Sequence, residues 1–370
     1  MRLRLAVLAI GALASAAALV LARRAGLDAA ANSWQPFVLV TGLLLIGVVA
    51  NQDGLFSALA GLIERLPGGD LPLYAVSMLV VAVVTALLNL DTSVAFLTPV
   101  LVLAARRRGA GELRFLYGCV FMSNAASLLL PGSNLTNLLV LAGEHRSGST
   151  FLARMFLPWT ASVLVTGVVV AIAFRGGSGG PVPQPGEHKR PAVLSLIVVG
   201  AALALILLLP DSALPVLLLG VGLVAIRLIQ QRIGIRTVLD QVDLPTLAGV
   251  FLLAVALGTV ARTWDAPQHL MAGAGSITTA VIAALASVVL NNLPAAVLLG
   301  SHVPGHPRSL LIGLNLGPNL AVTGSLSALI WWRAAMAVGA RPSALRYSKV
   351  GIVLVPVSIA AALVAGRLTV

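Results

Sequence analysis

Residues 72–105 read PLYAVSMLVVAVVTALLNLDTSVAFLTPVLVLAA, an apolar stretch that one polar pentad interrupts. Its 34 residues exceed the roughly 20 that a single helix needs to cross the hydrocarbon core of a membrane. The pentad, NLDTS at 89–93, leaves a second arm at 94–105 that is too short to cross alone. We therefore predict a re-entrant helical hairpin with the pentad at its tip.

A second hairpin is predicted at 268–300, where NNLP at 291–294 again leaves a short second arm. In each half of the chain, the next apolar segment is broken as well. Residues 115–143 contain LPGSN at 130–134, and residues 309–332 are interrupted by GPN and TGS. Each half is therefore expected to contain a hairpin with a polar tip, a broken span and an ordinary span.

The overall composition indicates a membrane protein. Hydrophobic residues make up 59% of the 370 residues and charged residues only 10%, with a mean hydropathy of +1.01. Because soluble domains carry about 25% charged residues, we predict an all-α polytopic membrane protein that lies in a lipid bilayer. The other apolar segments lie at 5–22, 36–50, 156–174, 192–209, 214–229, 244–261 and 349–366.

The net charge of +12 has a simple explanation in such a protein. Lys and Arg concentrate in the loops, where they fix orientation, so no nucleic-acid partner is expected. With a cytoplasmic N-terminus, 17 of these residues would lie inside and seven outside. The segment 5–22 is expected to be a retained first span rather than a cleaved signal peptide. The expected location is the plasma (cytoplasmic) membrane, with several spans.

A Gly- and Pro-rich polar stretch at 175–191 reads as a cytoplasmic linker between two halves. Residues 1–174 form the expected N-terminal repeat, and residues 192–370 form the C-terminal one. On the topology above, the hairpin at 72–105 enters from the cytoplasm and the hairpin at 268–300 from outside. The halves would then be two inverted-topology repeats, the arrangement of alternating-access carriers.

Helix breaks within a membrane free backbone N–H and C=O groups, which persist only beside a cavity or packed protein. Asn, Ser and Thr bond to such freed helix ends, and helix N-termini suit anions or polar oxygens. A purely structural alternative exists, because Asp91, Asn134, Asn292 and Ser325 each precede an apolar run and would suit a helix N-cap. Four paired breaks nevertheless favour a binding site.

Asp91 is the most informative single residue. Of the 12 acidic residues, it alone lies in the middle of an apolar stretch. An ionised carboxylate at the bilayer centre costs at least about 2.5–3.5 kcal/mol, so a residue of this kind is expected to be functional. Binding and release of a proton is the favoured role, and binding of another cation is the alternative.

Several stretches carry a family resemblance. Residues 290–294 read LNNLP and residues 314–326 read LNLGPNLAVTGSL; in the first half, Asp91 is followed by LTP at 97–99, NAASL at 124–128 and SNLTN at 133–137. These patterns resemble the arsenite permease family, the membrane subunit of arsenical pumps, within a wider ion-transporter superfamily. Leu90 departs from the family pattern, which typically has Asn directly before the Asp.

The resemblance implies a two-domain, elevator-like carrier that exports arsenite or antimonite and is driven by proton entry. It also makes a separate ATPase subunit and a homodimer candidate partners. Carried over motif by motif, Asp91 would be the proton-linked carboxylate. The implied substrate-binding residues are Asn89, Thr92, Asn124, Ser133, Asn134 and Asn137 in the first half and Asn291, Asn292, Asn315, Asn319, Thr323 and Ser325 in the second.

Three functions remain open. The leading one is proton-coupled export of an arsenite-like oxyacid, because a neutral As(OH)₃ needs hydrogen-bonding groups and neither break contains a cationic side chain. The second is a Na⁺- or H⁺-coupled carrier of organic or inorganic anions, such as dicarboxylates or citrate. The third is a membrane scaffold subunit without transport. No Walker, Ser-His-Asp or metalloprotease motif occurs, so we expect no enzyme activity, cofactor or metal site.

Overall fold

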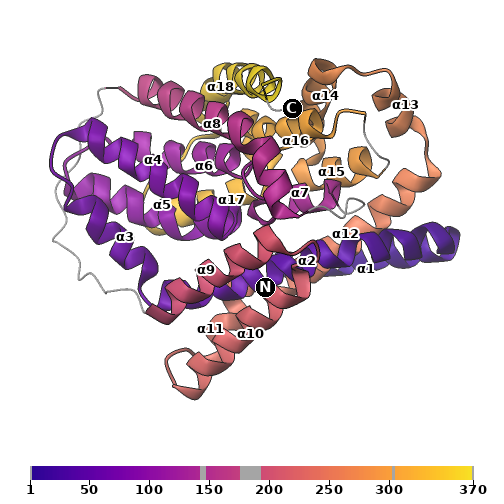
Figure 1. Ribbon diagram of the computed structural model, residues 1–370, viewed down its shortest axis with the longest axis horizontal. Coiled ribbons are helices and arrows are strands. Elements are labelled where there is room, and N and C mark those ends of the chain that lie inside the picture. The colour runs from indigo at the N-terminus through magenta and orange to yellow at the C-terminus, as the bar shows by residue number, and fades with distance from the viewer. Residues whose placement is uncertain (1, 142–146, 176–192, 302–304, 369–370) are drawn as a thin grey trace.

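The structure of the protein, a computed structural model, describes residues 2–141, 147–175, 193–301 and 305–368. Every regular element in these ranges is a helix. The long helices fall into two groups, which lie one above the other in Figure 1. Except for residue 175, the linker expected at 175–191 lies outside the described residues.

We call the lower group in Figure 1 the platform. It consists of α1 (Arg2–Leu21), α2 (Arg23–Gln52), α9 (Val193–Leu208), α10 (Ala213–Ile229), α11 (Ile235–Val242) and α12 (Leu244–Thr263). Helix α1 packs along α12, and α2 packs against both α10 and α12. Glycines allow these close approaches: a Cβ on Gly249 would lie 2.7 Å from the backbone N of Leu8, and one on Gly42 would lie 2.8 Å from the backbone of Leu217. Such small residues are typical of helix interfaces in membranes.

We call the upper group the body, and it contains both predicted hairpins and both broken helices. Its first part is α4 (Asp70–Leu87), α5 (Leu90–Arg107), α6 (Glu112–Ala126), η1 (Pro131–Ser133), α7 (Leu135–Val140) and α8 (Gly148–Ala173). Its second part is α14 (Ser276–Leu290), α15 (Asn292–Gly300), α16 (Pro307–Leu316), η2 (Gly317–Leu320), η3 (Val322–Gly324), α17 (Leu326–Ala337) and α18 (Ala344–Gly366). Two short helices join the groups: α3 (Leu55–Glu64) precedes α4, and α13 (Ala266–Ala272) precedes α14.

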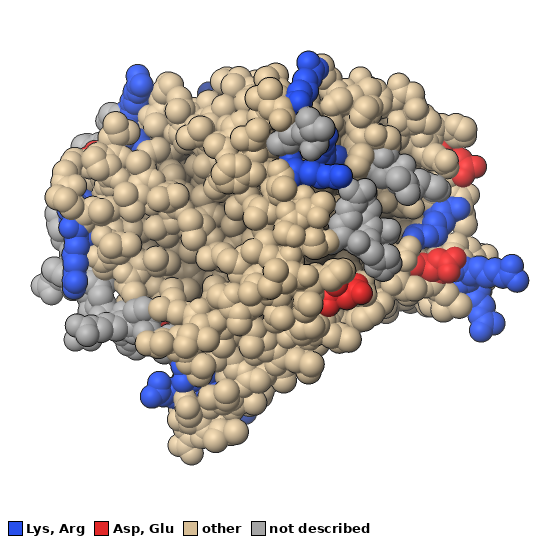
Figure 2. Space-filling model, viewed as in Figure 1, with Lys and Arg blue, Asp and Glu red and all other residues tan. Residues whose placement is uncertain are grey.

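The surface of the molecule suits a hydrocarbon solvent. Among the described residues, five helices are long and apolar enough to cross a membrane. Large apolar side chains lie on the outside, with Val20, Leu21 and Ile229 each more than 80% exposed. Figure 2 shows most Lys and Arg of the visible face near its margins and a broad area of other residues between them. Water would not tolerate so much exposed apolar surface in a soluble protein, whereas lipid does.

The first hairpin differs from its prediction in two respects. Its second arm is not the short piece at 94–105, because α5 begins at Leu90 and has 18 residues, as many as α4. The pentad is not a loop: only Leu88 and Asn89 separate the two helices, and Asp91, Thr92 and Ser93 belong to α5. Their low hydropathy predicted an interruption of the helix. Because Asn89 caps α5, the helix can begin at the next residue, Leu90, and include them.

Other boundaries also differ from those expected. The polar stretch 23–35 is helical and belongs to α2, which has 30 residues and is therefore about 45 Å long. Such a helix extends beyond a hydrocarbon core of about 30 Å, so its polar first turns need not be apolar. Helix α3 was not predicted, because ten residues are too few for a hydropathy signal. The first arm of the second hairpin begins at Ser276 rather than at 268, because α13 ends before it.

A buried aromatic cluster holds the broken helices in the body. Trp331 and Tyr347 are fully buried and lie with ring centroids 5.7 Å apart. The Trp331 Nε1 donates to the backbone carbonyl of Leu116 at 2.8 Å, and the Tyr347 hydroxyl donates to that of Pro318 at 3.1 Å. These bonds attach α17 to α6 and α18 to η2. The carbonyl of Pro318, which lies in the second break, thus finds a partner inside the protein.

Candidate functional site

The two hairpin tips share an unusual backbone conformation. Asn89 has φ 152° and ψ 172°, and Asn291 has φ 81° and ψ 150°. This region of backbone space is occupied almost only by glycine, and other residues held there cost of order 1–3 kcal/mol. Each Asn also caps the second arm of its hairpin: Asn89 Oδ1 accepts from Thr92 N at 2.8 Å, and Asn291 Oδ1 accepts from Leu293 N at 3.4 Å. Strain of this kind is typical of functional sites.

The two broken helices restart in a similar way. Asn134 caps α7 by accepting from Thr136 N at 3.0 Å, and Ser325 caps α17 by accepting from Ala328 N at 3.3 Å. These two residues therefore form the helix caps that the sequence suggested. At the tips the caps are the preceding residues, Asn89 and Asn291, and not Asp91 and Asn292 as the purely structural alternative supposed.

Buried amides join the first broken helix to the second. Asn124 Nδ2 donates to Asn319 Oδ1 at 2.8 Å, and Asn134 Nδ2 donates to Asn315 Oδ1 at 2.7 Å. Asn315 Nδ2 in turn donates to Asn137 Oδ1 at 2.7 Å. All five side chains are at most 3% exposed. We call this set the amide network; it brings together five of the residues that the sequence predicted as substrate ligands.

Asn315 is the hub of the amide network. Its Oδ1 accepts from Asn134 and from the hydroxyl of Ser127 at 2.6 Å. Its Nδ2 donates to Asn137 and to the carbonyl of Leu311 at 2.8 Å. An Asn side chain makes about four hydrogen bonds at most, so Asn315 has none left for a solute. Its role in this conformation is to hold the two breaks together.

Asp91 stands apart from the amide network. Its side chain is only partly buried, and among the described residues it has no hydrogen-bond or ion-pair partner. Two buried amide atoms are likewise without a partner: Nδ2 of Asn89 on the same tip and Oδ1 of Asn124 on α6. The tip lies against α6, because Ser123 donates to Ser93 at 3.4 Å. These atoms, one carboxylate, one donor and one acceptor, have unused capacity for an ion or a solute.

The remaining predicted ligands lie in other surroundings. Ser133 donates to the carbonyls of Ser127 and Leu130, both at 2.5 Å, and thereby closes the first break. Asn291 Nδ2 donates to the carbonyl of Thr323 at 3.0 Å, which joins the second tip to η3. Asn292 is buried, whereas the Thr323 side chain is exposed. Among the described residues, no hydrogen bond joins the Asn291 or Asn292 side chain to the amide network.

Two features on the platform side complete the site. Thr92 of the first tip packs against Gly47 of α2, so the tip touches the platform directly. A cavity of about 130 Å³ lies on the border between the groups, lined by Gln35 of α2, Pro131 of η1 and Arg308 of α16. Asp91 does not line this cavity. The first broken helix therefore has open space beside it, on the side that faces the platform.

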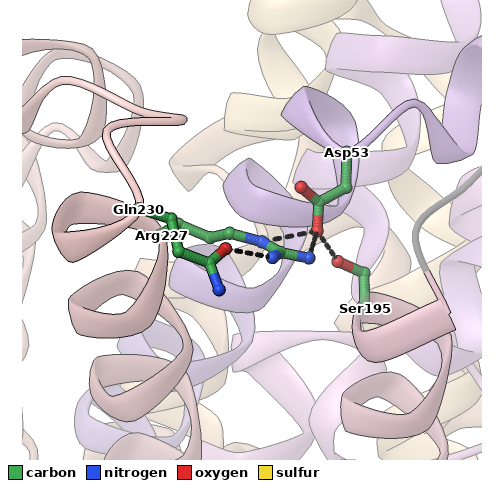
Figure 3. Close-up of polar contacts among 4 residues, drawn as sticks. All are labelled: Asp53, Ser195, Arg227 and Gln230. Atoms are coloured by element: carbon green, nitrogen blue, oxygen red, sulfur yellow. Dashed lines mark hydrogen bonds and ion pairs between the residues drawn. The ribbon is translucent and has the colours of Figure 1, made fainter.

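Sequence reasoning missed two elements of this arrangement. The first is Ser127, whose hydroxyl donates to Asn315. It lies about one helical turn after Asn124 in the NAASL motif, and this spacing could have indicated that both side chains face the same partner. Asp53 and Arg227 form an ion pair within the platform (Figure 3), and their side chains are only 5% and 4% exposed. Arg227 lies inside the apolar stretch 214–229, and that position was the available signal for a buried partner.

Comparison with known proteins identifies the family. The citrate transporter family (CitMHS) matches residues 3–338. The chain belongs to this family of secondary transporters. Family membership makes it a multi-pass integral membrane protein and a transporter rather than an enzyme.

Individual relatives are distant. The arsenical pump membrane protein of Escherichia coli is 25% identical over 338 residues, which cover 80% of this chain and 78% of that protein. The 46 kDa membrane protein of Mycobacterium leprae is 24% identical and covers 89% of this chain and 85% of its own length. An uncharacterized transporter of Mycobacterium tuberculosis is 26% identical, with 89% of this chain and 84% of that protein covered.

Among solved structures, the Alcanivorax borkumensis YdaH transporter has a similar fold. Its TM-score is 0.58 at 12% identity, with 89% of this chain and 84% of that chain covered. At this identity the likeness concerns the fold alone. It supports the prediction of an all-helical, multi-span membrane protein.

Proposed function

We propose that this transporter exports an arsenite-like oxyacid in exchange for protons, by alternating access. The observation that carries the proposal is the Asp91 carboxylate, which has no partner among the described residues and belongs to a hairpin tip that contacts α6, the helix that precedes the first break. The alternative of a scaffold subunit without transport is disfavoured, because the chain belongs to a transporter family.

Asp91 is the proposed coupling residue. Ionised, it costs at least about 2.5–3.5 kcal/mol in a membrane interior, and a bound proton removes that cost. The unpartnered Nδ2 of Asn89 and Oδ1 of Asn124 would complete the coupling site. We expect protonation and solute binding to alternate there, so that the body crosses only in a neutralised or loaded state. Na⁺ is the competing coupling ion, because carboxylate and amide oxygens also suit a hard cation.

We further propose that the two halves are inverted repeats, which together supply the body. Support comes from the repeated element order and from the matching contacts between halves: α17 packs on α5, and α7 packs on α15. The tips also match, since Asn89 and Asn291 share one rare backbone conformation and one capping role. In this scheme, the platform stays in place while the body moves the site from one side of the membrane to the other.

The chemistry of the site favours a small neutral solute. The members of the amide network are uncharged, and they offer hydroxyl, amide and carbonyl groups. As(OH)₃ is neutral and presents hydroxyl groups that both donate and accept, so it needs no cationic ligand. Binding it would require part of the amide network to open, because Asn315 is already saturated.

The decisive experiment is transport into proteoliposomes of the full chain under imposed pH and Na⁺ gradients. Arsenite accumulation that follows the pH gradient is the expected result, with protein-free liposomes as the control. Absence of arsenite movement, together with Na⁺-dependent uptake of a carboxylate, would overturn the proposal.

A carboxylate carrier is the second candidate, and the family's description as citrate transporters favours it. Helix N-termini at four breaks would bind carboxylate oxygens without Arg. Citrate with and without Mg²⁺ therefore belongs in the same assay. Citrate uptake that competes with arsenite would show one shared site, whereas uptake of citrate alone would replace the first candidate.

A further inference from the structure

The end of α2 is firmly attached to the platform. Asp53 Oδ2 accepts from Arg227 Nε at 3.0 Å and from Arg227 Nη2 at 2.6 Å, and it also accepts from the Ser195 hydroxyl (Figure 3). Arg227 Nη1 donates in addition to Gln230 Oε1 at 2.7 Å. Breaking a buried ion pair of this kind is strongly destabilising, because one charge stays behind uncompensated. The pair therefore joins the last turn of α2 to α9 and α10.

Helix α3, which starts only two residues later, is attached to the body instead. Glu64 at its end forms an ion pair with Arg107 of α5. Phe56 in its first turn stacks on Phe96 of α5, with ring centroids 4.8 Å apart. Both contacts tie α3 to the helix that carries the first tip.

The loop after α3 is held by the same helix. Arg108 at the end of α5 donates from Nη1 to the carbonyl of Leu66 at 2.9 Å, and from Nη2 to that of Gly68 at 2.7 Å. The chain from α3 to the start of α4 is thus attached to α5 at Phe96, Arg107 and Arg108. A change of angle between the two groups must therefore occur before α3.

Between the two attachments lies a single residue, Gly54, with φ +88° and ψ 14°. We infer that Gly54 is the hinge between platform and body on this side of the molecule, and that α3 moves with the body. The inference rests on the proposed movement of the body. Glycine crosses between backbone regions at little cost, whereas Asp53 and α3 are each held by side-chain bonds. A rotation of the body is therefore absorbed at this residue.

Distances between spin labels test the inference directly. Labels go on Leu62→Cys in α3, Leu79→Cys in α4 and Ile229→Cys in α10, whose side chains are 54%, 59% and 82% exposed. The single native cysteine, Cys119, is fully buried and leaves the background low. Pairs of labels are measured in full-length protein in liposomes, with and without a pH gradient and arsenite.

The expected result is a constant distance from α3 to α4 and a changing distance from α3 to α10. The opposite result, a constant α3–α10 distance with a changing α3–α4 distance, would overturn the hinge while the proposed movement stands. A constant α4–α10 distance during measured transport would overturn the movement itself, and with it the hinge. The two failures are thus distinguishable.

A matched pair of glycine variants gives an independent readout. Gly54→Ala should lower the maximal transport rate severalfold and leave arsenite binding unchanged. Gly109→Ala is the control, because Gly109 also has a positive φ, +67°, joins α5 to α6 within the body, and has open space around a built Cβ. Equal rates for both variants would contradict a hinge at Gly54.

Discussion

Gly47 of α2 and Thr92 of α5 meet where the first hairpin tip touches the platform. A Cβ built on Gly47 would lie 2.8 Å from Cγ2 of Thr92 and 3.6 Å from its Cβ, so this contact leaves no room for a side chain on α2. A carrier whose body moves against its platform must separate these two residues in every cycle. The contact is therefore a place where the proposed movement can be stopped.

We predict that the double variant Gly47→Cys, Thr92→Cys forms a disulfide that abolishes transport. The Cβ separation of 3.6 Å lies within the range of about 3.5–4.5 Å that disulfides require, and the change removes the methyl group that would collide. Transport should be lost on oxidation and return with reductant. The single variants show what the substitutions alone do. Full transport by the oxidised protein would contradict a moving body.

A second cysteine pair controls for the disulfide itself. Gly300 of α15 and Val140 of α7 have the same spacing, 3.6 Å from a built Cβ to Cβ, but both belong to the body. Oxidation of Gly300→Cys, Val140→Cys should therefore leave transport intact. Loss of transport in this variant would mean that movement within the body, between the second hairpin and the first broken helix, is required.

Replacing Asp91 should separate coupling from solute passage. Asp91→Asn keeps the shape and cannot release a proton, so we expect accumulation driven by a pH gradient to fall to the level of empty liposomes. Exchange of labelled for unlabelled solute at equal concentrations should continue. Asp70→Asn, at the exposed start of the same hairpin, is the matched control. Gradient-driven uptake by Asp91→Asn would rule out Asp91 as the coupling group.

Two variants of Asn89 distinguish its backbone role from a ligand role. Asn89→Gly keeps the backbone conformation at a cost of a few tenths of a kcal/mol for the lost cap. Asn89→Ala also forces a non-glycine side chain into a glycine-only region, which adds about 1–3 kcal/mol. Thermal unfolding in detergent should rank them in this order. If the free Nδ2 donates to an oxygen of the solute, both variants lose transport; wild-type transport by Asn89→Gly would limit Asn89 to the backbone.

Asn315→Ala should destabilise the body more than Asn319→Ala does. The first change removes four hydrogen bonds, including those from Ser127 and Asn134, and the second removes two, with Asn124 and with the carbonyl of Phe121. Each buried group left unsatisfied costs about 1–3 kcal/mol. Unfolding temperatures of the two variants, measured in one detergent, test the ranking. Equal temperatures would mean that the amide network relaxes around the lost hub.

Local features of the structure could be predicted from the sequence. The positions of the helix breaks follow from Pro, Gly and Asn within apolar segments, because hydrocarbon penalises an unbonded backbone wherever it occurs. The capping roles of Asn134 and Ser325 follow for the same reason. Each of these predictions needs only the properties of a few neighbouring residues.

Helix lengths were less predictable at the polar tip. The hydropathy pattern placed Asp91 and Thr92 outside the helix that follows. In the structure, Asn89 caps α5, and both residues lie in its first turn. That outcome depends on the backbone angles of Asn89, which are held by the packing of the tip against α2 and α6. Propensity along the chain does not contain this information.

By itself, the sequence determined the class of the protein, the breaks and the amides that lie in them, because these depend on hydropathy and local backbone chemistry. Only the tertiary structure decided which amides remain free. Asn315 lies far along the chain from Asn134 and Asn137, yet the packing of the body lets its Oδ1 accept from Asn134 and its Nδ2 donate to Asn137, which helps to saturate the Asn315 side chain. Hydrogen bonds are short and directional, so only that packing separates a saturated hub such as Asn315 from a carboxylate, Asp91, that is still available.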